Sequence, residues 1–457
     1  MSTSSRRILI SCLIFIIIIC LCLSVVSLAG AIGILVFRKE GVSLNLPFQG
    51  SAPTPTISLS EAEIDLQMDE IQSQVSEIRG LSAKGPVSRK LLTEDQLRQH
   101  VIDDFLKDYT PEEAQNDTIS LAAFGLLPPD FDLHDFLLEL YSEQIAGFYD
   151  HETKEMYIVQ GGSFQGPERL TYAHEFQHVL QDQNYDIQNG LNYNEEICKS
   201  EPERCAAIQA LLEGDASLTE LTWFQNFASA QDRREIIDKY NNYQSPIYDS
   251  APDFLKEDFL FPYQQGQEFV QTLFEQGGWQ AVNRAYQQLP VSTEQILHPE
   301  KYPDDQPITV SIPELNGELE ADWVEVDRGV LGEWYTYLVL AHGREPQSRI
   351  AKKTAGAAAA GWGGDAYVVY YNPNSQQTFM VLKTIWDTSE DAEEFAKAFE
   401  TYATSRFGKP VARRNTSITW QSTTDYTGFY IQDSQTLWIF APDQSTVQAI
   451  LPEIQNP

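Results

Sequence analysis

The residues best suited to chemistry are His174, Glu175 and His178, a His-Glu-x-x-His pattern in a chain of 457 residues with only seven histidines. Two histidines four positions apart lie on one face of a helix, where both rings can reach the same metal ion. Glu175 lies about 100° further around the helix, where it can reach a water on the metal without being a ligand. The pattern predicts a Zn²⁺ site with two His ligands and Glu175 as general base. The alternative is a helix that carries both histidines without a metal.

A catalytic zinc needs a third protein ligand and keeps one position open. We expect this ligand to be Glu213, which follows His178 by 35 residues and shares a helix face with the small residues Ala206, Ala210 and Ser217. Small side chains let two helix backbones approach closely, as a carboxylate requires if it is to reach a metal on a neighbouring helix. The alternative is an ordinary solvated glutamate. The rivals for the ligand role lie in the preceding polar connection and are Glu195, Glu196, Glu201 and Glu203.

Residues 174–178 (HEFQH) and 212–216 (LEGDA) give the segment 145–217 a resemblance to the gluzincin class of zinc metallopeptidases. Residues 292–302, around His298, are similar to a tract of uncharacterised bacterial proteins of this kind. The resemblance implies a zincin-like fold, a His, His, Glu zinc site and peptide-bond hydrolysis with Glu175 as general base.

The chain departs from this class in the residues that support the ligands. Thermolysin-like gluzincins place an aspartate four residues after the ligand glutamate as a partner for a His ligand, whereas this chain has Ser217 there. Asp215 is about 200° from Glu213 around a regular helix, so it is expected to point away from the metal. Asp182, one turn after His178, is the other candidate partner, and its alternative role is that of a solvated acid at a helix end.

A tetrahedral oxyanion needs a hydrogen-bond donor beyond the zinc. We choose His298 as this second catalytic residue, and the alternative is a structural histidine beside Pro299. The other candidates by residue type are Tyr240, Tyr248 and Tyr302.

The elements that position these side chains are expected to be mostly helical before residue 306. Helical patterns start near residues 61, 93, 131, 167 and 202, and residues 146–150 and 155–159 predict a β-hairpin. We place strand 155–159 at a sheet edge, where an extended peptide can add by main-chain hydrogen bonds. The predicted fold class is α+β, with a mainly helical zincin-like metallopeptidase domain over 61–306.

The pattern of apolar residues changes from mostly helical to mostly strand-like beyond residue 307. Strand patterns appear at 366–371, 378–385, 418–420, 427–432 and 437–440, with helices from 389 to about 402 and from 446 onward. These elements predict an α+β C-terminal domain over 307–457.

The N-terminal leader contains thirty uncharged, mostly apolar residues from 8 to 37, and about 20 such residues can span a bilayer. We expect residues 1–39 to form a short cytoplasmic stub and a membrane anchor, with a cleaved signal peptide as the alternative. Residues 40–60, rich in Pro, Ser and Thr, predict a flexible stalk. The expected localisation is the cell membrane, single-pass, with the bulk of the chain extracytoplasmic. Cys198 and Cys205 are either a disulfide or two free thiols.

The charge balance limits the class of partner. Against 66 acidic side chains stand 31 basic ones, and a net charge of −35 excludes a surface that tracks nucleic-acid phosphates. The predicted function is a membrane-anchored zinc metalloendopeptidase that acts on peptides or proteins. The alternatives are a catalytically inactive surface binding or adhesion protein and a zinc amidase acting on cell-wall cross-links. The sequence does not indicate the cleavage specificity or the oligomeric state.

Overall fold

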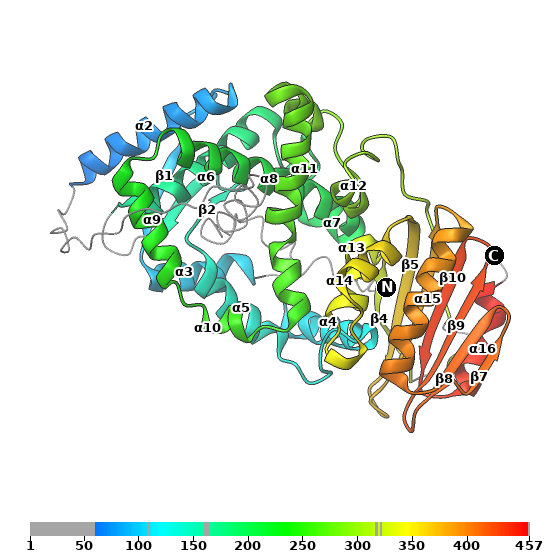
Figure 1. Ribbon diagram of the computed structural model, residues 1–457. Coiled ribbons are helices and arrows are strands. Elements are labelled where there is room, and N and C mark those ends of the chain that lie inside the picture. The colour runs from blue at the N-terminus through cyan, green and yellow to red at the C-terminus, as the bar shows by residue number, and fades with distance from the viewer. Residues whose placement is uncertain (1–59, 108, 160–163, 316–318, 320–321, 456–457) are drawn as a thin grey trace, which may run out of the picture.

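The protein combines a mainly helical body with a seven-stranded C-terminal sheet (Figure 1). The computed structural model describes residues 60–455, apart from residue 108 and the segments 160–163, 316–318 and 320–321. The predicted mixture of helices and strands is therefore confirmed, with the helices concentrated before residue 306 and the larger sheet after it.

The prediction of a membrane protein is corrected. None of the helices in the described part of the chain has the length and the apolar character that crossing a bilayer requires. The predicted anchor, residues 8–37, lies outside the described residues, as does nearly all of the predicted stalk. Neither a membrane localisation nor a membrane partner is therefore proposed for this chain.

Several helices of the helical body begin with the capping residues that the sequence predicts. At the start of α6, for example, the backbone N–H of Gln165 donates to Glu168 at 3.0 Å, and Pro167 lies in the first turn. The helices are α2 (Glu61–Arg79), α3 (Glu94–His100), the π-helix η2 (Val101–Phe105), α4 (Pro111–Phe124), α5 (Leu133–Gln144), α6 (Gly166–Tyr185), α7 (Glu195–Ser200), α8 (Pro202–Asn226), α9 (Ala230–Asn242), α10 (Pro246–Ser250), α11 (Asp253–Ala285) and α12 (Thr293–Leu297).

A three-stranded sheet lies in this body. The predicted hairpin is confirmed as β2 (Gly147–Asp150) and β3 (Glu155–Val159), which pair antiparallel. The expectation that β3 is an edge strand is wrong, because β1 (Ser88–Leu92) pairs parallel with its other side and gives the order β1-β3-β2. Both main-chain edges of β3 are occupied, so a peptide cannot add to it as a further strand.

The C-terminal sheet is antiparallel throughout, in the order β4-β5-β6-β10-β9-β8-β7. All five predicted strands and both predicted helices are present, and β4, β7, α13 and α14 are additions. The elements are β4 (Val324–Gly329), α13 (Gly332–His342), the 3₁₀ helix η3 (Pro346–Ser348), α14 (Lys352–Ala359), β5 (Trp362–Asn372), β6 (Gln377–Trp386), α15 (Ser389–Phe407), β7 (Ala412–Arg414), β8 (Ser417–Gln421), β9 (Tyr426–Gln432), β10 (Gln435–Ala441) and α16 (Gln444–Gln455).

The two faces of this sheet belong to different cores because successive side chains of a strand point to opposite sides. Tyr367 of β5 belongs to the large core of the helical body, where the ring of Phe124 in α4 lies 5.3 Å from its ring. The neighbouring Val368 belongs to a second core with Val447 and Ile450 of α16. The boundary predicted near residue 307 lies between α12 and β4, and the two parts share the large core.

Helices α8 and α11 cross at two glycines. A Cβ at Gly214 would lie 2.1 Å from the carbonyl oxygen of Gly266, and a Cβ at Gly266 would lie 2.1 Å from that of Ala210. The small residues of α8 do permit a close helix approach, as the sequence suggested. The helix that they admit is α11, whereas the expected partner was the helix with the paired histidines.

Candidate metal centre

Helix α6 presents His174, Glu175 and His178 to the interior of the helical body. Their exposed fractions are 0, 0 and 2%. Helix α8 passes beside α6 and contributes Glu213, which is 4% exposed. The side chains that the sequence grouped from two distant segments therefore lie together in a buried site.

The distances between these groups fit the ligand shell of a metal. His174 Nε2 lies 3.3 Å and His178 Nε2 3.6 Å from the same oxygen of Glu213, and one ligand atom from each of the three residues lies within 4.8 Å of the others. Three atoms that each bind a tetrahedral zinc at about 2.1 Å lie about 3.4 Å apart. The buried Nε2 of His178 makes no hydrogen bond to any described residue, as expected of a metal ligand.

The group has three His, Cys, Asp or Glu members within the described part of the chain. A structural zinc takes four protein ligands, whereas a catalytic zinc takes three and leaves a position for water or substrate. The ligand set therefore fits a catalytic centre.

The surroundings of Glu213 favour its negatively charged form, which is the form that binds a cation. Burial by itself raises the pKa of Glu213, but the charge of His178 and the hydrogen bond from His174 outweigh it and lower the pKa to about 2. Burial lowers the pKa of His174, and the hydrogen bonds to Glu213 and Glu220 reverse this and raise it to about 10. Without metal, His174 therefore carries a proton whose charge is balanced by Glu213 and Glu220. Metal binding at His174 must displace that proton.

Each histidine is held through its Nδ1. His174 Nδ1 lies 2.9 Å from Glu220 Oε2, and His178 Nδ1 lies 2.6 Å from Gln181 Oε1. A donor bond at Nδ1 leaves the Nε2 lone pair for a metal. Sequence reasoning missed both partners, although the spacing holds a signal: Glu220 follows Glu213 by two helical turns and so lies on the same face of α8.

Glu175 is fully buried beside the first histidine. It directly follows His174 in α6, and its negative charge contributes to the raised pKa of that histidine. Its role as a general base stays a prediction.

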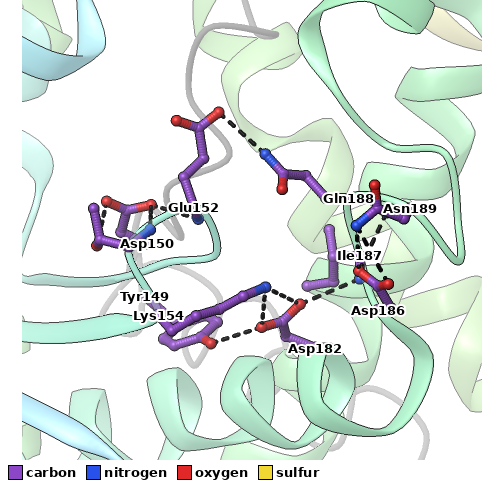
Figure 2. A network of polar contacts seen from close by, with 10 residues as sticks. Tyr149, Asp150, Glu152, Lys154, Asp182, Asp186, Ile187, Gln188 and Asn189 are labelled. Carbon is purple, nitrogen blue, oxygen red and sulfur yellow. Dashed lines mark hydrogen bonds and ion pairs between the residues drawn. The ribbon is translucent and has the colours of Figure 1, made fainter.

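The two predicted candidates for supporting aspartates lie elsewhere. Asp215 bonds to neither His ligand and pairs with the buried Arg79 at 2.8 Å. Asp182 lies at the end of α6 toward the β2–β3 turn, where it accepts from Tyr149 at 2.7 Å and from Lys154 at 2.7 and 2.9 Å (Figure 2). It joins α6 to the hairpin and does not contact either His ligand.

His298 is also placed elsewhere. It follows α12, is 27% exposed on its side chain, and its Nε2 lies 2.8 Å from Glu333 Oε1. The same short helix contacts α8 through Thr293, whose backbone N–H donates to Glu203 at 2.6 Å. Glu203 precedes Glu213 by ten residues, or about 15 Å along the helix. We therefore assign His298 no role in the centre.

The three tyrosines considered with it make their own contacts. Tyr302 donates to the carbonyl of Gln288, Tyr248 to that of Lys256, and Tyr240 is 40% exposed. The tyrosine whose ring lies close to the centre is Tyr263 of α11, 6.4 Å from the ring of His174.

The rival ligands are accounted for by other contacts or by exposure. Glu203 binds Thr293, Glu195 pairs with Lys199, and Glu196 and Glu201 are exposed. The disulfide alternative for the two cysteines of this region is confirmed, because Cys198 of α7 is bonded to Cys205 of α8.

Comparison with known proteins adds one match. Residues 321–451 match the model of a domain of unknown function, DUF8575. No curated protein and no solved structure matches the chain. The matched range contains the C-terminal sheet and none of the residues of the metal centre, so the function must be inferred from the geometry of the centre.

Proposed function

We propose that this protein is a zinc-dependent metallopeptidase of the gluzincin type that hydrolyses peptide bonds in peptides or proteins. The observation that carries the proposal is the convergence of His174, His178 and Glu213 at separations of 3.3 and 3.6 Å, with the buried Glu175 beside them. This chemistry requires two histidine ligands, one carboxylate ligand and a second carboxylate that does not bind the metal.

In the proposed reaction the two histidines hold the ion through Nε2 and Glu213 holds it through its carboxylate. When bound, zinc supplies Lewis acidity, which polarises the scissile carbonyl and lowers the pKa of a water molecule. Glu175 accepts the proton of that water and passes it to the leaving amine. Glu220 and Gln181 keep the two imidazole rings oriented.

The intact Glu175 argues against an inactive binding protein. A buried carboxylate that is not a ligand costs free energy to desolvate, and a protein that only bound a partner through another surface would not need it here. Its presence beside the three ligands is explained by the chemical step.

Metal analysis and turnover of the purified full-length chain test the proposal together. We expect one zinc per chain and cleavage of fluorescein-labelled casein or of a quenched peptide library. Glu175→Gln is expected to keep the zinc and lose turnover, while Glu213→Ala loses both. Glu196→Gln, an exposed acid that was a rival for the ligand role, is the matched control and is expected to behave as wild type. Absence of zinc from folded protein, or full activity in Glu175→Gln, would overturn the proposal.

A further inference from the structure

The last residue of the N-terminal helix α2 reaches into the body behind the metal centre. The side chain of Arg79 has no exposed surface, and its Nε lies 2.8 Å from Asp215 Oδ1. Its Nη2 donates to Asp215 Oδ2 at 3.0 Å and to Asn283 Oδ1 at 2.9 Å. The guanidinium also lies 4.2 Å over the ring of Trp279. Arg79 is thus held on several sides and in turn holds Asp215 through one hydrogen bond from Nη2 and through the ion pair at Nε.

Asp215 collects donors from three other side chains. Tyr286 donates to its Oδ2 at 2.7 Å, and Gln177 donates to the same oxygen at 2.9 Å. Gln181 Nε2 lies 3.4 Å from this oxygen. Both glutamines belong to α6, so the carboxylate gripped by Arg79 connects α2 to the helix that carries the histidines.

Gln181 links Asp215 to the ligand His178. Its Nε2 donates to the carbonyl of Leu212 at 2.9 Å, and its Oε1 lies 2.6 Å from His178 Nδ1. The carbonyl of Leu212 and the carboxylate of Asp215 offer acceptors, so the amide nitrogen faces them and the amide oxygen faces the ring. An oxygen at this place requires a proton on His178 Nδ1, which leaves the Nε2 lone pair directed at the metal position.

From these contacts we infer that Arg79 is a positioning residue of the metal centre, which fixes the ring orientation and tautomer of His178 through Asp215 and Gln181. The inference rests on the proposed function, since it assigns a task to Arg79 only if the centre binds metal. Helix α2 then supports the metal centre through its last residue, Arg79, although none of its residues belongs to the ligand group.

Removal of Arg79 would leave the buried carboxylate of Asp215 without its cation and held only by Tyr286, Gln177 and Gln181. We expect its oxygens to shift, which weakens one of the two acceptors that orient the amide of Gln181. Loss of an outer partner of a metal ligand lowers metal affinity by about 10–100-fold. We expect a loss of this size for Arg79→Met, which keeps the length of the side chain. Arg79→Lys, which retains the charge but has one donor nitrogen in place of the planar guanidinium, is expected to recover part of the affinity.

The matched control is Arg89, which also binds α2 to the body. It pairs with Asp65 at 3.1 Å and Asp69 at 2.7 Å, both on α2, and its side chain is 21% exposed. Its described contacts do not include Asp215 or Gln181. Arg89→Met therefore weakens the attachment of α2 to the body and leaves the contacts between Arg79 and His178 in place. We expect the metal affinity of this variant to stay within about twofold of wild type.

The experiment measures zinc dissociation constants of the full-length chain by competition with a chromogenic chelator, on samples whose folding is checked by circular dichroism. Cobalt-loaded samples add the visible absorption bands, which report ligand geometry and do not respond to stability alone. A double-mutant cycle with Arg79→Met, Gln181→Ala and the double variant then tests whether Arg79 acts through Gln181. If Arg79 acts through Gln181, the two losses are not additive, and the cobalt spectra of both single variants shift.

Three results would overturn the inference: wild-type affinity in folded Arg79→Met, an equal loss in Arg89→Met, or additive losses in the cycle. If Arg79→Met does not fold, Arg79→Lys carries the same test, and wild-type affinity and spectrum in that variant together with additivity toward Gln181→Ala would also overturn it. A wild-type chain that binds neither zinc nor cobalt would instead overturn the proposed function itself, and the inference with it.

Discussion

Replacement of Glu220 by alanine should weaken zinc binding without removing any ligand. Glu220 Oε2 lies 2.9 Å from His174 Nδ1, and the two side chains are 2% and 1% exposed, so water has little access to replace the lost acceptor. A hydrogen bond to a charged group in such a site is worth about 1.5–3 kcal/mol, and loss of an outer partner of a metal ligand costs about 10–100-fold in affinity, or about 1.4–2.7 kcal/mol. The two ranges agree.

The pH dependence sharpens this prediction. The hydrogen bond to Glu220 is one of the contacts that raise the pKa of His174, so its removal lowers that pKa and reduces the competition between protons and metal. The loss of zinc affinity in Glu220→Ala is therefore expected to be larger at pH 9 than at pH 6.5. Glu220→Gln keeps an acceptor oxygen and should show a smaller loss. Chelator competition measured across this pH range is the assay, and an affinity in Glu220→Ala equal to wild type at every pH would refute the reasoning.

Three further predictions concern stability. Gly214→Ala should lower the free energy of unfolding by about 1–3 kcal/mol or more, because its methyl would lie 2.1 Å from the Gly266 oxygen. The helical Gly356, which has no heavy atom within 4 Å of an added Cβ, is the control, and Gly356→Ala should stabilise by about 0.5–1 kcal/mol in the same denaturant titration. Replacing Cys198 and Cys205 together by alanine opens a loop of sequence separation 7 and should cost about 2 kcal/mol by chemical denaturation, whereas an unchanged midpoint would contradict a disulfide in the folded protein. The melting temperature should fall between pH 5 and pH 8.5, and a rise would contradict the assigned burial. The cause is that burial raises the pKa of several carboxyl groups above the value of about 4 in the unfolded chain, so stability that is full below pH 4 is lost as these groups ionise. The pKa is about 6 for Asp258 and Asp365, about 7 for Asp327 and Glu294, and about 8 for Glu203.

The parts of the centre that the sequence predicts are those fixed by one helix. The two histidines share a face of α6 because they are four residues apart, and this holds whatever the rest of the chain does. Glu213 was identified from the small residues around it, although their closest backbone contact is with α11 and not with α6. The contact of Glu220 with His174 depends on how α8 is rotated against α6, which local spacing does not determine. Gln181, by contrast, lies three residues after His178 on the same helix, so its contact with that histidine is local.

The errors have similar physical causes. The strand β3 lies inside its sheet because β1 pairs with it. The five residues of β1, SRKLL, show no alternation of polar and apolar side chains that would predict a strand. His298 belongs to a tract that resembles others in sequence, but its neighbour Glu333 comes from α13, a helix that the sequence did not predict. Contacts between distant segments decided both cases.

The contact between Gly214 and Gly266 also fixes the rotation of helix α8, which carries Glu213. A helix advances 1.5 Å and turns 100° for each residue, so a slip of α8 by a single residue would swing Glu213 through more than a quarter of a circle and away from both imidazoles. Side chains at an ordinary helix crossing can repack to accommodate a small slip, but here backbone meets backbone and no side chain is available to yield. The same crossing fixes Tyr263, which precedes Gly266 by three residues on α11 and lies beside His174. The two glycines thus fix the rotation of Glu213 about the axis of α8 and the position of the Tyr263 ring beside His174.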